Sequence, residues 1–351
     1  MLEPADSPWI MSVKPRPRAV RASRPGSLLN PPGSGNSEAP APAFGYPRGM
    51  TELLFHTDSY LREFEAEVVG VDTVRNAVLL DRTAFYAGGG GQPCDVGELG
   101  PIGAASPPEA GATPDAAAAI GAATVSPQDA ATATRWRVTA VKKEGKDVLH
   151  FLAGAGSSVS VEASGAEASD ATEPAAGAPG ELPVAGDRVT GAIAWERRYR
   201  LMRTHTAMHI LCGVVWRDYG AQVTGGNMEP LEGRMDFEFE NLQRELVDEI
   251  EAKINAEVEA AREVRVKILP RAEAETIPDL IRTKINLVPA AITEIRTVEI
   301  VGLDLQADGG THVANTREVG PLRILDYKSK GRINKRIRVG LEERPAPAGN
   351  E

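Results

Sequence analysis

The sequence predicts an α+β protein in which a small β-barrel precedes a domain built from an antiparallel sheet and helices. Within residues 50–196, apolar and polar side chains alternate in several short runs, which is typical of half-buried strands. After residue 197 two segments have the apolar spacing of a helix instead. Further alternating runs occur between and after these segments, as far as residue 342. The change of pattern therefore predicts two domains, residues 50–196 and 197–342.

The predicted barrel contains two hairpins and a closing strand. Residues 64–80 alternate around a turn at Asp72 to Asn76, and residues 136–152 alternate around a turn at Glu144 to Lys146. A further strand is expected over residues 189–196, directly before the helical pattern begins.

Low-complexity segments interrupt and flank these elements. Residues 102–134 and 154–182 are rich in Ala, Gly, Pro, Ser, Thr and Glu, so we expect two flexible insertions in the barrel. Residues 1–49 lack periodic apolar positions and are expected to be a disordered tail. This tail has the basic composition of a transit leader, but we favour an over-extended start with Met50 as the natural beginning. Residues 343–351 are a second short tail.

The second domain should combine two helices with several strands. Residues 197–219 have the spacing of a half-buried helix, and Asn241 is expected to cap a long amphipathic helix with apolar residues four positions apart. Alternating runs predict the strands of one antiparallel sheet at residues 234–240, 264–270, 294–302 and, as a final pair, 321–341.

Composition excludes several classes of protein. No run of about eighteen apolar residues occurs, so we expect no membrane span. The net charge of -10 argues against a wholly basic nucleic-acid coat. Two cysteines are too few for a disulfide scaffold or a four-cysteine zinc site, and they suit a reducing compartment, which is the cytoplasm or, if the tail is a transit peptide, an organelle. Any metal must therefore rely on His, Asp or Glu.

Two histidines on the first predicted helix form a chelate candidate. His205 and His209 are four residues apart, so both imidazoles project from one face of the helix. The alternative is a pair of surface or core histidines. In the protease motif HExxH a glutamate base follows the first histidine, but Thr206 stands there in this chain, so a peptidase is not expected.

A second cluster follows near the end of the chain. Asp308 and His312 flank a Gly-Gly-Thr segment, and two glycines allow the chain to fold back so that the carboxylate and the imidazole converge. An ordinary β-turn is the alternative for this segment. Together with His205 and His209, the pair would give three nitrogens and one oxygen, which suits zinc or a similar divalent ion.

Three segments of the chain together resemble one family. They are residues 84–99 (AFYAGGGGQPCDVGEL), 195–211 (WERRYRLMRTHTAMHIL) and 307–320 (ADGGTHVANTREVG). In this order they are similar to the free-standing alanyl-tRNA editing proteins, which are relatives of the editing domain of alanyl-tRNA synthetase and, more distantly, of the second additional domain of threonyl-tRNA synthetase. The glycine-rich segment resembles the longer members, in which a barrel precedes the editing domain.

The resemblance implies roles for particular residues. His205, His209 and His312 match the metal ligands of the family, whereas Asp308 stands where many members have a cysteine. A carboxylate is a harder ligand than a thiolate, which leaves two roles open for Asp308. It either binds the ion directly, or it orients His312 through a hydrogen bond without contacting the ion.

The substrate pocket is expected to use polar residues around the metal. In family members the glycine-rich loop approaches this pocket, and Gln92 would be its polar contribution. Thr206 and Thr224 are short hydroxylated residues near the pocket, and by resemblance Thr224 would pair with the hydroxyl of a serine substrate; a purely structural threonine is the alternative. The loop lacks the GK[ST] ending of an NTP-binding loop, so no NTP is expected.

Basic residues gather in two places despite the acidic balance, and these patches suit the phosphates of tRNA. Solvated protein surface is the alternative. The residues assigned to tRNA binding are Arg197, Arg198, Lys328, Lys330, Lys335, Arg336 and Arg338.

The expected function is that of a hydrolase acting in trans on mischarged tRNA-Ala, with one divalent metal ion, Zn²⁺, as cofactor. It would release serine, with glycine as a second candidate substrate, and would not charge tRNA itself. The main rival is a tRNA-binding module that has the fold but no hydrolytic activity, because Asp308 departs from the family pattern. A generic metallohydrolase would not need the glycine-rich loop or the basic residues.

Overall fold

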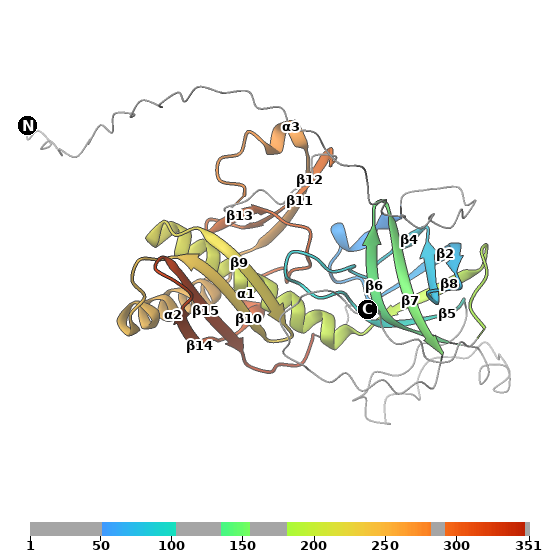
Figure 1. Cartoon of the computed structure of the whole chain (residues 1–351), viewed down its shortest axis with the longest axis horizontal. Coiled ribbons are helices and arrows are strands. Elements are labelled where there is room, and N and C mark those ends of the chain that lie inside the picture. Colours follow the sequence, from blue (N-terminus) through green and yellow to red (C-terminus); the bar gives the residue numbers. More distant parts are fainter. Residues whose placement is uncertain (1–50, 103–134, 155–180, 282–291, 348–351) are drawn as a thin grey trace, which may run out of the picture. The chain divides into compact units, whose positions relative to one another are not determined.

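The computed structural model describes residues 51–102, 135–154, 181–281 and 292–347 (Figure 1). The predicted tail at residues 1–49, almost all of both predicted insertions, and the last residues of the chain lie outside the described residues. Among the helices of the described ranges, none is both long enough and apolar enough to cross a membrane.

The first part of the described chain is a closed barrel, as predicted. Its strands follow one another around the barrel in the order β2, β3, β7, β6, β5, β8, and every neighbouring pair is antiparallel. The strands are β2 (Glu63–Asp72), β3 (Ala77–Leu80), β5 (Gly97–Pro101), β6 (Trp136–Glu144), β7 (Asp147–Gly154) and β8 (Arg188–Ile193).

The alternating sequence builds this barrel directly. Along β2 every second residue from Phe64 is buried, so one face fills the barrel and the other meets solvent. Val68, Leu80 and Leu99 are fully buried in the core that results. Ahead of the barrel, the short strand β1 (Glu52–Leu53) pairs in parallel with β4 (Arg82–Thr83), and a 3₁₀ turn, η1 (Leu54–His56), follows β1.

Helix α1 (Trp195–Tyr219) is the centre of the second part. It begins two residues earlier than predicted and ends at Gly220, whose φ of 62° closes the helix in the left-handed conformation. The prediction of a half-buried helix was wrong, because nearly every residue between Trp195 and Val215 is buried. The reason is that α1 contacts two strands of one sheet on one side and strand β13 and helix α4 elsewhere on its surface.

Two sheets replace the single sheet that the sequence pattern predicted. Strands β14 (Leu322–Ser329), β15 (Asn334–Leu341), β10 (Glu232–Glu238) and β9 (Val223–Glu229) form a four-stranded antiparallel sheet in this order. Strands β11 (Val264–Pro270), β12 (Glu294–Ile300) and β13 (Asp304–Ala307) form a separate antiparallel sheet. The alternating patterns locate strands but carry no information on which strands pair.

The remaining helices pack on these sheets. Helix α2 (Arg244–Glu259) shares the main core with α1, and the short helices α3 (Arg271–Ala274) and α4 (Thr316–Val319) follow β11 and precede β14. The predicted cap was wrong: the residue before α2 is Gln243 rather than Asn241, and it makes no side-chain capping bond. The four-residue apolar spacing was correct, since Ile250, Ile254 and Val258 are buried.

Candidate metal centre

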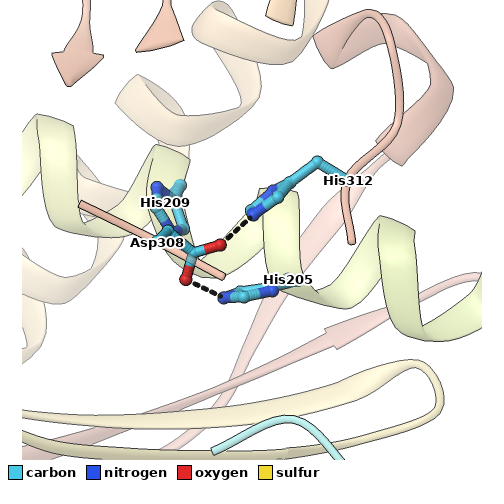
Figure 2. Close-up of side chains that lie close together, drawn as sticks. All are labelled: His205, His209, Asp308 and His312. Carbon is cyan, nitrogen blue, oxygen red and sulfur yellow. Dashed lines mark hydrogen bonds and ion pairs between the residues drawn. The ribbon is translucent and has the colours of Figure 1, made fainter. Parts of the chain in front are cut away.

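His205 and His209 lie one turn apart on the buried stretch of α1 (Figure 2). Their exposed fractions are 4% and 6%, and their ring centroids are 5.1 Å apart. Because both imidazoles are buried on one face of the helix, their polar contacts must come from each other or from the segment that packs against this face. The residues that pack opposite come from the loop that follows β13.

This loop brings Asp308 and His312 to the two helical histidines. Gly310 is needed at the closest approach, because a Cβ atom there would overlap the His205 ring and lie 2.7 Å from Gln92 Oε1. The sequence argument for a fold-back was right, but the physical reason is lack of space rather than an unusual backbone angle. The backbone nitrogen of Gly310 also donates to Asp308 Oδ2 at 2.7 Å, which fixes the carboxylate.

The four side chains form one cluster of possible metal ligands: His205, His209, Asp308 and His312. One donor atom of each lies within 4.8 Å of the others. Asp308 Oδ1 is 3.5 Å from His205 Nε2, and Asp308 Oδ2 is 3.0 Å from His312 Nε2 (Figure 2). Two ligand atoms of one tetrahedral zinc ion are about 3.3 Å apart, so these distances suit a single ion bound between the side chains.

Gln92 fixes the orientation of His205. The Gln92 side-chain oxygen accepts a hydrogen bond from the backbone nitrogen of Thr311 at 3.1 Å and lies 2.9 Å from His205 Nδ1. Because this oxygen can only accept, Nδ1 carries the proton and Nε2 keeps a free lone pair toward the cluster. Gln92 Nε2 donates to the Thr311 hydroxyl at 2.9 Å. Gln92 is 2% exposed, so its amide is engaged in positioning and is not open to a substrate.

The glycine-rich loop carries Gln92 to this place. Gly88 to Gly91 all have positive φ values, which other residues rarely adopt, and Gly89 and Gln92 exchange backbone hydrogen bonds across a tight turn. A Cβ atom on Gly91 would lie 3.0 Å from the Gly226 oxygen, so the loop rests directly on β9. The backbone nitrogen of Met228 donates to the Gly91 oxygen at 3.0 Å, which ties the loop to that strand.

The other two histidines also have partners at Nδ1. The Thr206 hydroxyl lies 3.2 Å from His312 Nδ1 and accepts from the backbone nitrogen of Val313. Asp304 Oδ2 lies 3.2 Å from His209 Nδ1. Each of the three rings thus has an oxygen atom within 3.2 Å of Nδ1, an arrangement that suits metal-binding histidines that coordinate through Nε2. Thr206 is fully buried, which does not fit the substrate contact predicted for it.

Arg296 is a site residue that the sequence analysis did not identify. It lies on β12 and is 6% exposed; its Nη1 donates to the Asp308 carbonyl at 3.0 Å and is 3.7 Å from Asp308 Oδ2. Its Nε donates to the His56 carbonyl at 2.9 Å. No motif marks Arg296, since a charged residue in an alternating strand is usually exposed. The role of Thr311, which binds Gln92, was also missed by the sequence analysis. The Gly-Gly-Thr motif could have indicated this residue, because Thr311 lies within it.

Burial and charge set the protonation of the cluster. Burial lowers the pKa of His205 well below its usual value and lowers that of His312 to about 4. Burial also acts on His209, but the hydrogen bond to Asp304 and the charge of Asp308 raise its pKa overall. For Asp308, burial opposes ionisation, yet His205 and His312 hold its pKa well below the usual range. Neutral His205 and His312 beside an ionised carboxylate are in the states that metal binding requires.

Thr224 lies apart from these contacts. It is exposed on β9 and its hydroxyl donates to Asn334 Oδ1 at 3.0 Å. Arg197 is half-buried and donates to the Cys94 carbonyl at 2.6 Å. Arg198 is fully buried, and its guanidinium pairs with Asp95, so the phosphate contact predicted for Arg198 does not fit the structure.

The basic residues near the end of the chain divide into exposed residues and residues that already have partners within the protein. Lys328 and Lys330 are exposed at the tip of the β14–β15 hairpin, as is Arg332 between them and β15. Lys335 is buried, with Nζ bonded to the carbonyls of Gly331 and Arg332, so it holds the hairpin turn instead of facing a ligand as predicted. The last two are paired across the sheet: Arg336 with Asp236 and Arg338 with Glu232.

The fold and the cluster define the class of protein: an α+β protein, joined to a β-barrel, with a buried cluster of three histidines and one carboxylate that could hold a metal ion. Comparison with known sequences agrees with this class. Residues 295–338 match the family described as the threonyl and alanyl tRNA synthetase second additional domain.

Full-length relatives narrow the assignment. The alanyl-tRNA editing protein AlaX-M of Saccharolobus solfataricus is 35% identical over 291 residues, which cover 82% of this chain and 98% of that protein. AlaX-M of Methanosarcina acetivorans is 34% identical over 288 residues, again 98% of its length. The alanine–tRNA ligase of Ignicoccus hospitalis is 35% identical over 292 residues, but these are 25% of the ligase. The chain belongs to the alanyl-tRNA editing protein family.

Proposed function

We propose that this protein hydrolyses the ester bond of mischarged tRNA-Ala, releasing serine and, as a second substrate, glycine. The observation that carries the proposal is the convergence of His205, His209, Asp308 and His312 in a chain that matches alanyl-tRNA editing proteins over nearly their whole length. A second relative, an alanine–tRNA ligase, supports the same function, because 82% of this chain matches 25% of the ligase. We expect the protein to be located in the cytoplasm, where charged tRNA is used in translation.

We assign one Zn²⁺ ion to the cluster. Three imidazole nitrogens and a carboxylate oxygen within 4.8 Å of one another favour zinc over magnesium or calcium, which prefer oxygen ligands. When bound, such an ion polarises an ester carbonyl or water and fixes the reacting end of the substrate. We propose His205, His209 and His312 as nitrogen ligands and Asp308 as the oxygen ligand.

The protein residues would contribute orientation more than acid–base chemistry. Asp308 is engaged by His312 and by the backbone of Gly310, and Asp304 is engaged by His209. Neither carboxylate is thus available as a general base, so we propose that the free hydroxyl of the terminal ribose relays a proton from the attacking water to the ribose oxygen that leaves when the ester bond breaks. The rigid loop at Gln92 and Thr311 would keep His205 in place while the ester reacts.

Discrimination and tRNA binding would use exposed groups. Thr224 is the exposed threonine of the predicted set, and it would pair with the serine hydroxyl after releasing Asn334. Lys328, Lys330 and Arg332 would contact tRNA phosphates from the hairpin tip. Arg197, Arg336 and Arg338 remain weaker members of the proposed tRNA surface, because each already has an internal partner.

Chelation tests the proposal. Purified protein should deacylate Ser-tRNA-Ala, lose this activity after treatment with a chelator and regain it on addition of Zn²⁺. His209→Ala should remain inactive with excess Zn²⁺ while still binding tRNA-Ala. A wild-type protein that binds zinc and tRNA-Ala but never deacylates Ser-tRNA-Ala would support the rival, a binding module of the same fold.

A further inference from the structure

We propose that Asp304 is a positioning residue of the metal centre: its carboxylate holds His209 at Nδ1 so that Nε2 faces the ion, and it adds a second negative charge to the site. The inference rests on the metal site assigned in the proposed function. Asp304 is the first residue of β13, and its side chain is fully buried with Oδ2 3.2 Å from His209 Nδ1.

A second side chain holds Asp304 in place. Gln306 lies two residues further along β13, on the same face of the strand. Its Nε2 donates to Asp304 Oδ2 at 2.6 Å and also to Cys212 Sγ at 3.3 Å. Cys212 is three residues after His209 on the same face of α1. This helix face therefore meets β13 through two neighbouring contacts, Gln306 with Cys212 and Asp304 with His209. Gln306 therefore sets the direction in which the Asp304 carboxylate points.

The close approach of β13 to α1 requires a glycine at position 213. A Cβ atom on Gly213 would lie 3.0 Å from Asp304 Cβ and 2.9 Å from Leu303 Cγ. Gly213 is also four residues after His209, on the face that meets β13. A glycine inside a long helix is less favourable than alanine, and here it allows Asp304 to reach the histidine.

Asp304 differs from the groups behind the other two histidines. His205 is held by the amide oxygen of Gln92 and His312 by the hydroxyl of Thr206, and both partners are neutral. A carboxylate behind a histidine increases the basicity of the opposite nitrogen as well as fixing the ring. His209 is therefore expected to be the strongest nitrogen ligand of the three.

Charge balance gives a second reason for a carboxylate at this position. The ion would sit in a buried site beside Arg296, whose Nη1 is 3.7 Å from Asp308 Oδ2. Asp308 alone cannot balance both this guanidinium and a divalent ion, and uncompensated charge is costly where water is excluded. Asp304, in contact with Nδ1 of His209, adds a second negative charge and so reduces the uncompensated positive charge from two to one.

The test is the zinc affinity of Asp304→Asn, measured on the full chain by competition with a chromophoric chelator. Asn keeps the shape and can still accept from His209, but it removes the charge. We expect the affinity to fall by about 10- to 100-fold, with the far-ultraviolet circular dichroism unchanged. Asp72→Asn is the matched control: this carboxylate caps the β2–β3 turn, so its replacement should lower thermal stability and leave zinc affinity unchanged.

A second variant covers the case in which Asp304→Asn fails to fold. Gly213→Ala should push Asp304 away from His209, and it should likewise weaken zinc binding and change the visible spectrum of the Co²⁺-loaded protein. An affinity of Asp304→Asn within about twofold of wild type would overturn the inference while leaving the proposed function intact. Conversely, if Asp304→Asn binds zinc weakly but the wild-type protein deacylates nothing, the positioning role is supported and only the proposed function is contradicted.

Discussion

Gln92 Oε1 lies 2.9 Å from Nδ1 of His205, although 113 residues separate the two in sequence. The first residue belongs to the loop that leaves β4 of the barrel region and the second to the central helix of the α+β part. This contact makes the glycine-rich loop part of the candidate metal centre. It also determines which nitrogen of His205 carries the proton, and so which nitrogen is available to an ion.

Replacing Gln92 should therefore damage metal binding. Gln92→Ala leaves the Nδ1 proton of His205 and the backbone nitrogen of Thr311 buried without their acceptor, at a cost of about 1–3 kcal/mol each. We expect zinc affinity to fall by about tenfold or more, as measured by chelator competition. Gln92→Glu is the control, because a carboxylate can accept both bonds and should retain most of the affinity. Equal zinc binding by wild type and Gln92→Ala would contradict a positioning role.

Asp308 gives a test of direct ligation. Asp308→Cys should keep or tighten zinc binding and should raise the preference for the softer Cd²⁺ over Zn²⁺, because thiolate is a softer ligand than carboxylate. Asp308→Ala should weaken the binding of both ions. Affinities would be measured for both ions with the same competing chelator. If the Cys variant shows the wild-type affinity and the wild-type preference, Asp308 does not bind the ion directly.

The exposed hairpin tip should contribute to tRNA affinity. Replacing Lys328, Lys330 and Arg332 by Ala should weaken the binding of charged and uncharged tRNA-Ala alike, and it should reduce the slope of log Kd against log salt by about one for each phosphate that is no longer neutralised. Single-turnover hydrolysis at saturating tRNA should be unchanged. The matched control replaces Lys142, Lys143 and Lys146, which are exposed around the β6–β7 turn of the barrel. Equally weakened binding in both triple variants would point to a general charge effect.

His150 should make the barrel sensitive to acid. It is fully buried in β7, with Nε2 2.8 Å from the Thr83 hydroxyl, and burial lowers its pKa from 6.5 to about 4. Between pH 6.5 and 4 the unfolded chain binds a proton at His150 that the folded chain does not, so stability falls as the pH falls. The decrease approaches about 3 kcal/mol at pH 4.

Urea denaturation as a function of pH, with chelator present to remove metal effects, measures this dependence. His150→Gln should lose less stability than wild type over the same pH interval. His56, whose pKa burial also lowers to about 4, should leave part of the acid sensitivity in the variant. Parallel pH profiles for wild type and His150→Gln would show that His150 is not protonated on unfolding.

Strong alternation and helical spacing made much of the fold predictable, whereas glycine-rich strands and distant pairings were not. The β2–β3 and β6–β7 hairpins follow directly from their sequence pattern. The strands β5 and β9 contain glycines that hide the alternation, because glycine has no side chain to point either way. Arg198 looked like a surface residue, since its partner Asp95 is remote in sequence and nothing local indicates the pairing.

At the site, the motifs located the four clustered side chains but not the residues behind them. HxxxH spacing places two imidazoles on one helix face whatever the rest of the fold. Asp304 and Arg296, in contrast, reach the cluster only because β12 and β13 pair next to α1. Positioning residues of this kind depend on tertiary contacts, so a single sequence does not identify them.

The most direct test is the rate of deacylation of Ser-tRNA-Ala relative to Ala-tRNA-Ala by zinc-loaded protein under single-turnover conditions. We expect rapid hydrolysis of the serine ester, little hydrolysis of the alanine ester, and no serine activity in His209→Ala. Equal hydrolysis of both esters, or wild-type activity in the fully metal-free protein, would contradict a zinc-dependent editing function.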